Sequence, residues 1–307
     1  MLAFILRRCA QSVFVLLGVA FAVFVLSRAT GDPATLLLPI DARPEQIAQF
    51  RVLWGLDKPI WEQFLIWVIN LLSGQLGTSF QAQRPVAQLI NERLMNSLVL
   101  ALSAILVAGV IGTVGGVLAA VRHGRMTDKI LRGFAMLGSG VPEFWIALML
   151  QYLLALRFPI FPVSRNEGPM SLVLPAVTLG WFLSAGILRL VRSGMLESLS
   201  SDYVLFARAK GLHEWQVVLK HALRNAFMTP LTFLGLYIGI LIGSAVIVEY
   251  VFAWPGLGSL AYEAVLARDF PTIEGVILVV TCAVVFSSLL VDLINAIADP
   301  RVRALGR

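Results

Sequence analysis

The sequence has few charged residues, few cysteines and few histidines. Only 14% of its 307 residues are charged, against about 25% in soluble domains, while 58% are hydrophobic. The mean hydropathy is +0.85. The two cysteines, Cys9 and Cys282, both fall in long apolar runs and cannot form a disulfide framework or a paired-cysteine metal site. This composition excludes an ordinary soluble domain and indicates an integral membrane protein.

The motifs of common enzyme classes are also missing. No G-x-x-x-x-G-K-[ST] loop is present to cradle a nucleotide. His123, His213 and His221 do not have metal-ligand spacing with acids or cysteines, and His213-Glu214 lacks the second histidine of HExxH. No serine has a nucleophile elbow around it. We therefore expect no catalytic residue, no metal site and no cofactor in this chain.

Six apolar runs are long enough to cross a membrane, which takes about 20 residues. The first follows Arg7 and Arg8, as a signal peptide would, but no small-x-small cleavage site comes after it and five more runs follow. We therefore expect it to be a retained helix. The predicted spans are Cys9–Arg28, Ser97–Val121, Gly133–Leu156, Leu172–Val191, Phe227–Val248 and Gly275–Ala298.

Basic residues are concentrated in alternate connecting segments. The two termini, the segment 122–132 and the segment 189–224 carry most of the 24 Lys and Arg residues and few acids. Because basic loops stay in the cytoplasm, this asymmetry predicts that both termini are cytoplasmic. The predicted organisation is a peripheral first helix (1–29), an external loop (30–96), a five-helix core (97–298) containing a cytoplasmic loop (193–226), and a cytoplasmic tail (299–307). Within the external loop, Ile60–Leu72 predicts an interfacial helix.

The stretch Asp202–Pro230 is the longest charged interruption in the second half of the chain. Asp202 is suited to cap a short helix, and Gly211 stands where a helix end favours a left-handed residue. A second helix follows, with an apolar stripe of Leu212, Trp215, Val218, Leu219 and Ala222. Two short helices around a glycine corner predict a protrusion that another protein grips. A basic helix-turn-helix for DNA is the alternative, but membrane spans on both sides disfavour nucleic-acid binding.

The run A-x-A-K-G-L followed by H-A-L-R-N-A resembles the cytoplasmic "EAA" loop of ABC-importer permeases, in the form found in peptide and nickel permeases of the dipeptide-permease B type. The general EAA pattern is matched only at Ala207, Gly211 and Leu223, so the resemblance is to the family variant. Further similar stretches are GDP at 31–33, GLDKP at 55–59 and WPGLG at 254–258. With PV at 85–86, these stretches occur in the family's order and spacing, and the resemblance extends over nearly the whole chain.

The resemblance implies an all-α transmembrane protein with the six-helix type I ABC-importer permease fold in a bacterial inner membrane. It implies a pore shared with a second homologous permease subunit, two ATPase subunits that bind ATP and Mg, and an external solute-binding protein. The solute class is dipeptides, oligopeptides or related small solutes. Residues expected to contact an ATPase are Ala207, Ala209, Lys210, Gly211, Leu212, Trp215, Val218, Leu219 and Arg224.

Three further groups of residues are candidates for function. Glycines at four-residue spacing, Gly112 with Gly116 and Gly235 with Gly239 and Gly243, indicate close helix packing, either static or along a moving pathway. Glu143 lies near the start of a span, where it either faces a pathway or caps a helix. The run Trp254, Pro255, Gly256 and Gly258 is expected to fold over an external mouth or to form a plain surface loop.

A stand-alone secondary transporter or channel is the alternative function. That class expects paired charges or broken helices at mid-membrane, of which the sequence shows few. A membrane-bound enzyme lacks its catalytic constellation. The residues do not distinguish among dipeptides, longer peptides, glutathione, opines and chelated nickel as the solute.

Overall fold

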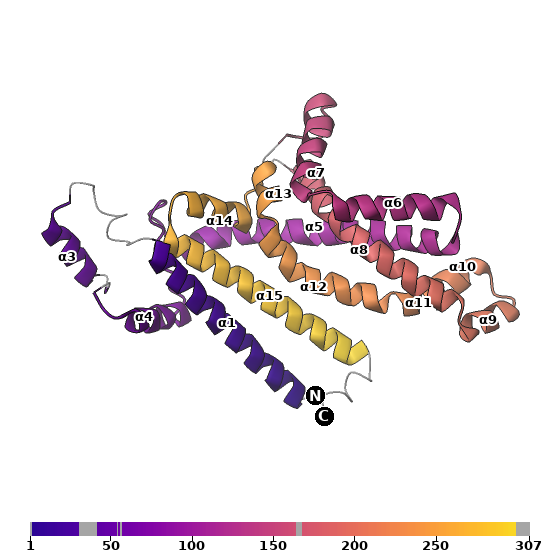
Figure 1. Cartoon of the computed structure of the whole chain (residues 1–307), viewed down its shortest axis with the longest axis horizontal. Coiled ribbons are helices and arrows are strands. Elements are labelled where there is room, and N and C mark those ends of the chain that lie inside the picture. The colour runs from indigo at the N-terminus through magenta and orange to yellow at the C-terminus, as the bar shows by residue number, and fades with distance from the viewer. Residues whose placement is uncertain (1, 31–41, 54, 56, 164–167, 299–307) are drawn as a thin grey trace.

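The computed structural model describes residues 2–30, 42–53, 55, 57–163 and 168–298, and the secondary structure of this part is helical apart from one isolated β-bridge between Thr78 and Pro85 (Figure 1). The helices of the first half are α1 (Leu2–Thr30), α3 (Pro44–Leu53), α4 (Ile60–Leu72), α5 (Val86–Val121), α6 (Met126–Gly140), α7 (Glu143–Leu150) and its π-helical continuation η1 (Gln151–Arg157). Those of the second half are η2 (Pro169–Leu172), α8 (Val173–Leu199), α9 (Asp202–Ala209), α10 (Glu214–Gln216), η3 (Val217–Ala222), α11 (Leu223–Ala226), α12 (Met228–Ser244), α13 (Val246–Val251), α14 (Leu257–Leu266) and α15 (Phe270–Ala298).

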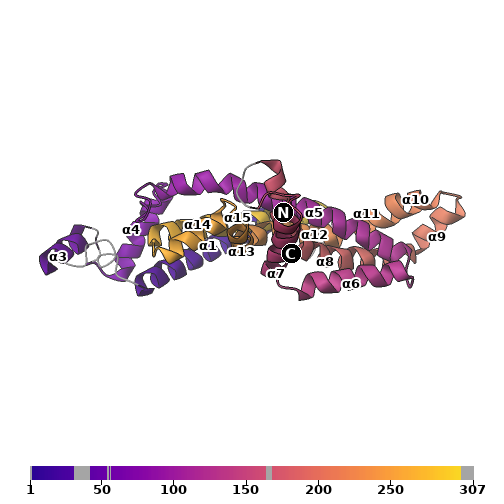
Figure 2. The same ribbon diagram turned by 90° about the horizontal axis from the view of Figure 1, so that it is seen from above.

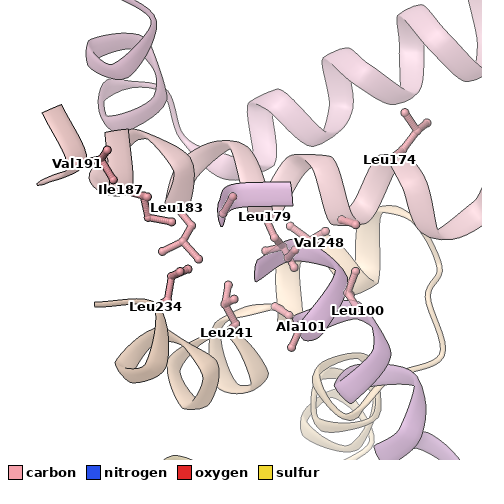
Figure 3. Close-up of a cluster of buried hydrophobic side chains, with 14 of the residues drawn as sticks. Leu100, Ala101, Leu174, Leu179, Leu183, Ile187, Val191, Leu234, Leu241 and Val248 are labelled. Atoms are coloured by element: carbon pink, nitrogen blue, oxygen red, sulfur yellow. The ribbon is translucent and has the colours of Figure 1, made fainter. Parts of the chain in front are cut away.

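The core is built on the contact between α5 and α8. A Cβ placed on Gly112 would lie 2.6 Å from Ile187 Cβ, and one on Gly116 would lie 2.6 Å from Val191 Cβ. The missing side chains therefore let the two backbones approach closely, as the spacing predicts. The buried side chains of α8 also face Leu234 and Leu241 of α12 (Figure 3).

Four helices are long and apolar enough to cross a membrane within the described residues, and one bent pair could add a fifth. Four of the six spans predicted from the sequence are therefore continuous helices in the structure, and the other two are interrupted. The third expected span, Gly133–Leu156, is divided into α6 and α7, which meet at 106°. Pro142 explains the break, because proline removes a backbone donor and forces the preceding Val141 into an extended conformation (ψ 130°).

Other predicted boundaries also move. The expected fifth span, Phe227–Val248, is interrupted at Ala245 between α12 and α13, and the 17 residues of α12 lie at the lower limit of the length that crosses the hydrocarbon. The second span begins at Val86 rather than Ser97, so the last part of the predicted external loop 30–96 is helix. The GDP stretch at 31–33 and the tail 299–307 lie outside the described residues.

The helix α1 is peripheral, as predicted, and lies beside α15 in both views of the molecule (Figures 1 and 2). Little of its apolar surface is buried. Its second contact is with α4, where Phe24 stacks near Phe64 and Trp67 with ring centroids 5.4 and 5.6 Å apart. The helix α4 has the bounds predicted from the sequence.

Candidate functional site

The candidate site is the protrusion formed by α9, α10, η3 and α11, which lies at the end of the molecule opposite α3 and α4 (Figures 1 and 2). Its first helix begins differently from the prediction. Asp202 is the first helical residue and Ser201 holds the capping position, with no side-chain capping hydrogen bond. Asp202 therefore lies in the first turn, where its charge favours the positive end of the helix dipole.

Gly211 forms the corner of the protrusion, and its left-handed conformation (φ +75°) confirms the prediction. The Gly211 N–H donates to the Arg208 carbonyl at 2.9 Å, and the Leu212 N–H reaches the Ala207 carbonyl at 3.5 Å. These two bonds are the Schellman arrangement that satisfies the last carbonyls of a helix. The turn between α9 and α10 is thus fixed by backbone hydrogen bonds.

The inner face of the protrusion is apolar and buried. It consists of Val204 and Ala207 from α9, and of Val217, Val218 and Ala222 from η3. Ala207 and Val218 were expected to contact a partner, and in the structure both side chains are buried in the chain's own core. They hold the protrusion in place.

The outer face carries large apolar side chains that nothing in the described chain covers. Trp215 is 63% exposed and Phe206 is 62% exposed, and Leu212, Leu219 and Leu205 are exposed as well. The single apolar stripe predicted for the second helix is therefore divided, with Trp215 on the exposed outer face and Val218 on the buried inner face. The second helix is not a uniform α-helix, because residues 217–222 are π-helical. A π-helical turn takes up more residues than an α-turn, which changes the face on which later side chains lie. Ala209, Lys210, Gly211 and Arg224 are also exposed.

Two charge interactions brace the outer face. The Arg208 guanidinium donates to the Glu214 carboxylate at 2.6 Å across the glycine corner. This hydrogen bond holds the pKa of Glu214 below its usual range. The stabilisation is therefore present at neutral pH and is lost as the pH falls through that lowered pKa. The second interaction is between Lys210 Nζ and the Phe206 ring, 4.6 Å from its centroid.

A second polar centre, which the sequence analysis missed, surrounds Glu249. This side chain is fully buried. Its carboxylate accepts hydrogen bonds from the Ser97 hydroxyl at 2.7 Å and from the Ser259 N–H at 2.9 Å, at the start of α14. A carboxylate at a helix N-terminus is favoured by free amide groups and by the dipole. The sequence did contain a signal for this centre, because Glu249 is an acid at the end of a long apolar run and lies a few residues before WPGLG.

The WPGLG run folds around this carboxylate. A Cβ at Gly256 would collide with the Glu249 carboxylate, so the glycine is required for the close approach. The Trp254 Nε1–H donates to the Asn96 carbonyl at 3.1 Å, and the Asn96 amide donates to the Pro255 carbonyl at 2.9 Å. The run is thus packed against the start of α5, with Trp254, Gly256 and Gly258 buried.

The remaining candidate residues lie apart from both centres. Glu143 is the first residue of α7, half-buried and without a capping hydrogen bond. A side chain at Gly235 would collide with Val291 of α15, and one at Gly243 would lie 3.2 Å from Val280. The surroundings of Gly239 fall outside the described residues. Within the described chain no three His, Cys, Asp or Glu residues converge in a way that could hold a metal ion.

Comparisons with known proteins agree with this architecture. The family model described as "Binding-protein-dependent transport system inner membrane component" matches residues 112–304, and a model of the N-terminal part of such membrane components matches residues 1–101. A putative peptide transport system permease protein of Brucella abortus is 40% identical over 99% of both chains. The dipeptide transport system permease protein DppB of Escherichia coli is 34% identical, again over 99% of both chains.

The fold also matches solved structures. An inward-facing structure of the MetNI methionine ABC transporter aligns with a TM-score of 0.59 at 18% identity, covering 69% of this chain and 97% of that one. A crystal structure of an amino acid ABC transporter gives a TM-score of 0.52 at 18% identity, covering 68% and 94%. These likenesses support the all-α type I importer fold. The chain belongs to the family of binding-protein-dependent transport system inner membrane components, and is an ABC-importer permease similar to the dipeptide permease DppB.

Proposed function

We propose that this chain imports peptides across a bacterial inner membrane and that its protrusion α9–α11 is the contact with an ATPase partner. The observation that carries the proposal is the uncovered apolar surface of Phe206, Leu212, Trp215 and Leu219 on a braced protrusion. A cluster of large exposed apolar side chains surrounded by polar residues is typical of a protein interface. Tryptophan is among the residue types that contribute most to the free energy of binding. The peptide solute rests on the names of the relatives, which are peptide and dipeptide permeases.

The protrusion is built to transmit force. Its inner face is buried in the chain's own core, and its corner is fixed by the hydrogen bonds around Gly211. Movement of an ATPase gripping Trp215 is therefore passed to η3, α11 and α12 rather than absorbed by a loose loop. Closure of the ATPases on ATP then rocks α12 against α15 and opens the pathway.

The proposed assembly contains more than this chain. Two ATPase subunits bind ATP and Mg, a second homologous permease completes the pore, and an external binding protein delivers the solute. The chain itself is the non-catalytic, pore-forming subunit. Both termini and the protrusion lie on the cytoplasmic side, as the placement of Lys and Arg favours.

The test is co-purification of the ATPases, together with peptide uptake, in cells carrying Trp215→Ala. We expect ATPase binding to weaken about 30-fold or more, since a tryptophan anchor is worth at least about 2 kcal/mol. Uptake should fall while the amount of permease in the membrane stays unchanged. Trp61→Ala in α4 is the matched control, because Trp61 is 61% exposed but lies at the other end of the molecule. Normal ATPase retention and uptake in Trp215→Ala cells would refute the proposed contact.

A further inference from the structure

A groove of about 770 Å³ runs between the first half of α1 and the second half of α15. Its walls are mostly apolar, with Gln11 and Ser12 of α1 among the lining residues. Phe14 and Val15 come from α1, and Val284, Val285 and Leu289 come from α15. Because α1 is buried on so little of its surface, the groove lies on the side of the molecule that a membrane surrounds.

The rim of the groove is polar and basic. Arg7 and Arg8 stand on the α1 side and Asp292 on the α15 side, while Ser288 lies next to Leu289 of the wall. Arg8 is paired with Asp292, its Nε lying 3.2 Å from Asp292 Oδ2, and this ion pair joins the two helices below the groove. Arg7 is exposed and lies outside that pair. The rim therefore carries a net positive charge at the end of an apolar channel.

We propose that this groove binds an anionic phospholipid, with an acyl chain along the apolar walls and the phosphate at Arg7. A basic pocket between membrane helices on the cytoplasmic side has the chemistry that selects anionic headgroups. The volume falls in the range of small-molecule sites, about 300–1,000 Å³. The bound lipid would fill the space between α1 and α15, and so tie the peripheral helix to the core.

The charge at the rim favours a lipid over a second copy of a membrane helix. A helix seated in the groove would cover the apolar walls, but it would neutralise Arg7 only if it carried an acid at that level. A phospholipid supplies both an apolar chain and a phosphate. Its acyl chain matches the apolar walls, and its phosphate matches the basic rim. The proposal does not depend on which solute the permease carries.

The test uses the full chain, purified in mild detergent and titrated separately with phosphatidylglycerol and phosphatidylcholine, with bound lipid counted by native mass spectrometry. We expect the wild-type chain to prefer phosphatidylglycerol. Arg7→Gln should weaken phosphatidylglycerol binding about fivefold, because one arginine near a membrane surface is worth about 1 kcal/mol. Arg122→Gln is the control, since Arg122 is exposed at the end of α5 and does not line the groove.

A second pair of variants tests the walls. Ser288→Trp places a large side chain in the groove and should remove the tightly bound lipid, while Leu106→Trp, on the exposed face of α5, should not. Equal binding of the two lipids by the wild-type chain, or equal losses in the Arg7 and Arg122 variants, would overturn the proposal. So would conversion of a dimer to a monomer by Ser288→Trp without loss of lipid, because the groove would then hold a second copy.

Discussion

The Ser97 hydroxyl links Glu249 to the first turn of α14: its Oγ donates to Glu249 Oε1 at 2.7 Å and accepts the Leu257 N–H at 2.7 Å. One side chain thus connects α5, α13 and α14. The second carboxylate oxygen takes the Ser259 N–H. The WPGLG run is consequently held by a buried carboxyl group whose partners come from two distant parts of the sequence.

Replacing Glu249 should therefore destabilise the protein strongly. Glu249→Ala removes the acceptor for the Ser97 hydroxyl and the Ser259 N–H and leaves a cavity, so we expect a loss of about 2–5 kcal/mol. Glu249→Gln fills the same space, but its side-chain NH₂ group faces one of these donors. The loss of stability should therefore be smaller than in Glu249→Ala. The measurement is the thermal unfolding midpoint in detergent, together with protease sensitivity at the WPGLG run.

The control for this experiment is Glu263→Gln. Glu263 also lies in α14, but its side chain is exposed and its contact with Arg93 is a loose 3.7 Å. Exposed ion pairs contribute about 0–1 kcal/mol, so the midpoint should hardly move. Similar midpoints for the Glu249→Ala and Glu263→Gln proteins would contradict the structural role assigned to Glu249.

The contact between α5 and α8 gives a second prediction, because it depends on glycine. Gly112→Ala would place a methyl group 2.6 Å from Ile187 Cβ and 3.0 Å from the Ser184 carbonyl oxygen. Overpacking of this kind costs about 1–3 kcal/mol. We expect a lower unfolding midpoint and less assembled transporter in the membrane.

Gly133→Ala in α6 is the matched control, since nothing lies within 4 Å of the added methyl group. Replacing a mid-helix glycine by alanine at an open position gains up to about 1 kcal/mol through helix propensity. The two substitutions should therefore shift the midpoint in opposite directions. A rise in both would mean that α5 and α8 do not approach as closely as the structure shows.

Local features of the sequence predicted much of this structure. The spacing of Gly112 and Gly116 identified a close helix contact, the apolar face of Ile60–Leu72 identified α4, and Gly211 identified the corner of the protrusion. Each signal depends on residues within a few positions of one another. The family resemblance, which the comparisons confirm, rested on such short runs as well.

Features that depend on distant partners could not be predicted in this way. Glu249 and Ser97 are hydrogen-bonded although they lie 152 residues apart in the sequence, and no local pattern predicts that contact. The break at Pro142 was missed because the flanking residues are apolar enough to read as one span. The burial of Val218, beside the exposed Trp215, depends on packing against the distant core, and the 3.6-residue period does not predict the π-helical turn at 217–222.

The proposed orientation predicts a labelling pattern across α5. Asp57 precedes this helix and Arg125 follows it, and its 36 residues are long enough to cross the membrane. With Cys9 and Cys282 replaced by serine, a cysteine at 57 should react with an impermeant thiol reagent in intact cells. A cysteine at 125 should react only after permeabilisation. The reverse pattern would place the protrusion outside and remove the basis for an ATPase contact.

The corner at Gly211 gives the most direct test of force transmission. A β-branched side chain is a severe outlier at φ +75°, whereas asparagine adopts this region at low cost. Gly211→Val should therefore strain the turn by about 1–2 kcal/mol and break the hydrogen bond from Leu212 to Ala207, while Gly211→Asn should keep both. Both substitutions add a side chain where no atom lies within 4 Å, so neither clashes within the chain.

We expect Gly211→Val to uncouple ATP hydrolysis from peptide uptake in reconstituted vesicles, with the ATPases still bound through Trp215. Gly211→Asn should transport at close to the wild-type rate. The ratio of ATP hydrolysed to peptide accumulated is the quantity to measure, because a weakened interface lowers both rates whereas a loosened corner raises the ratio. Equal ratios in the two variants would show that the backbone geometry of the corner carries no force, and that only the apolar surface beside it matters.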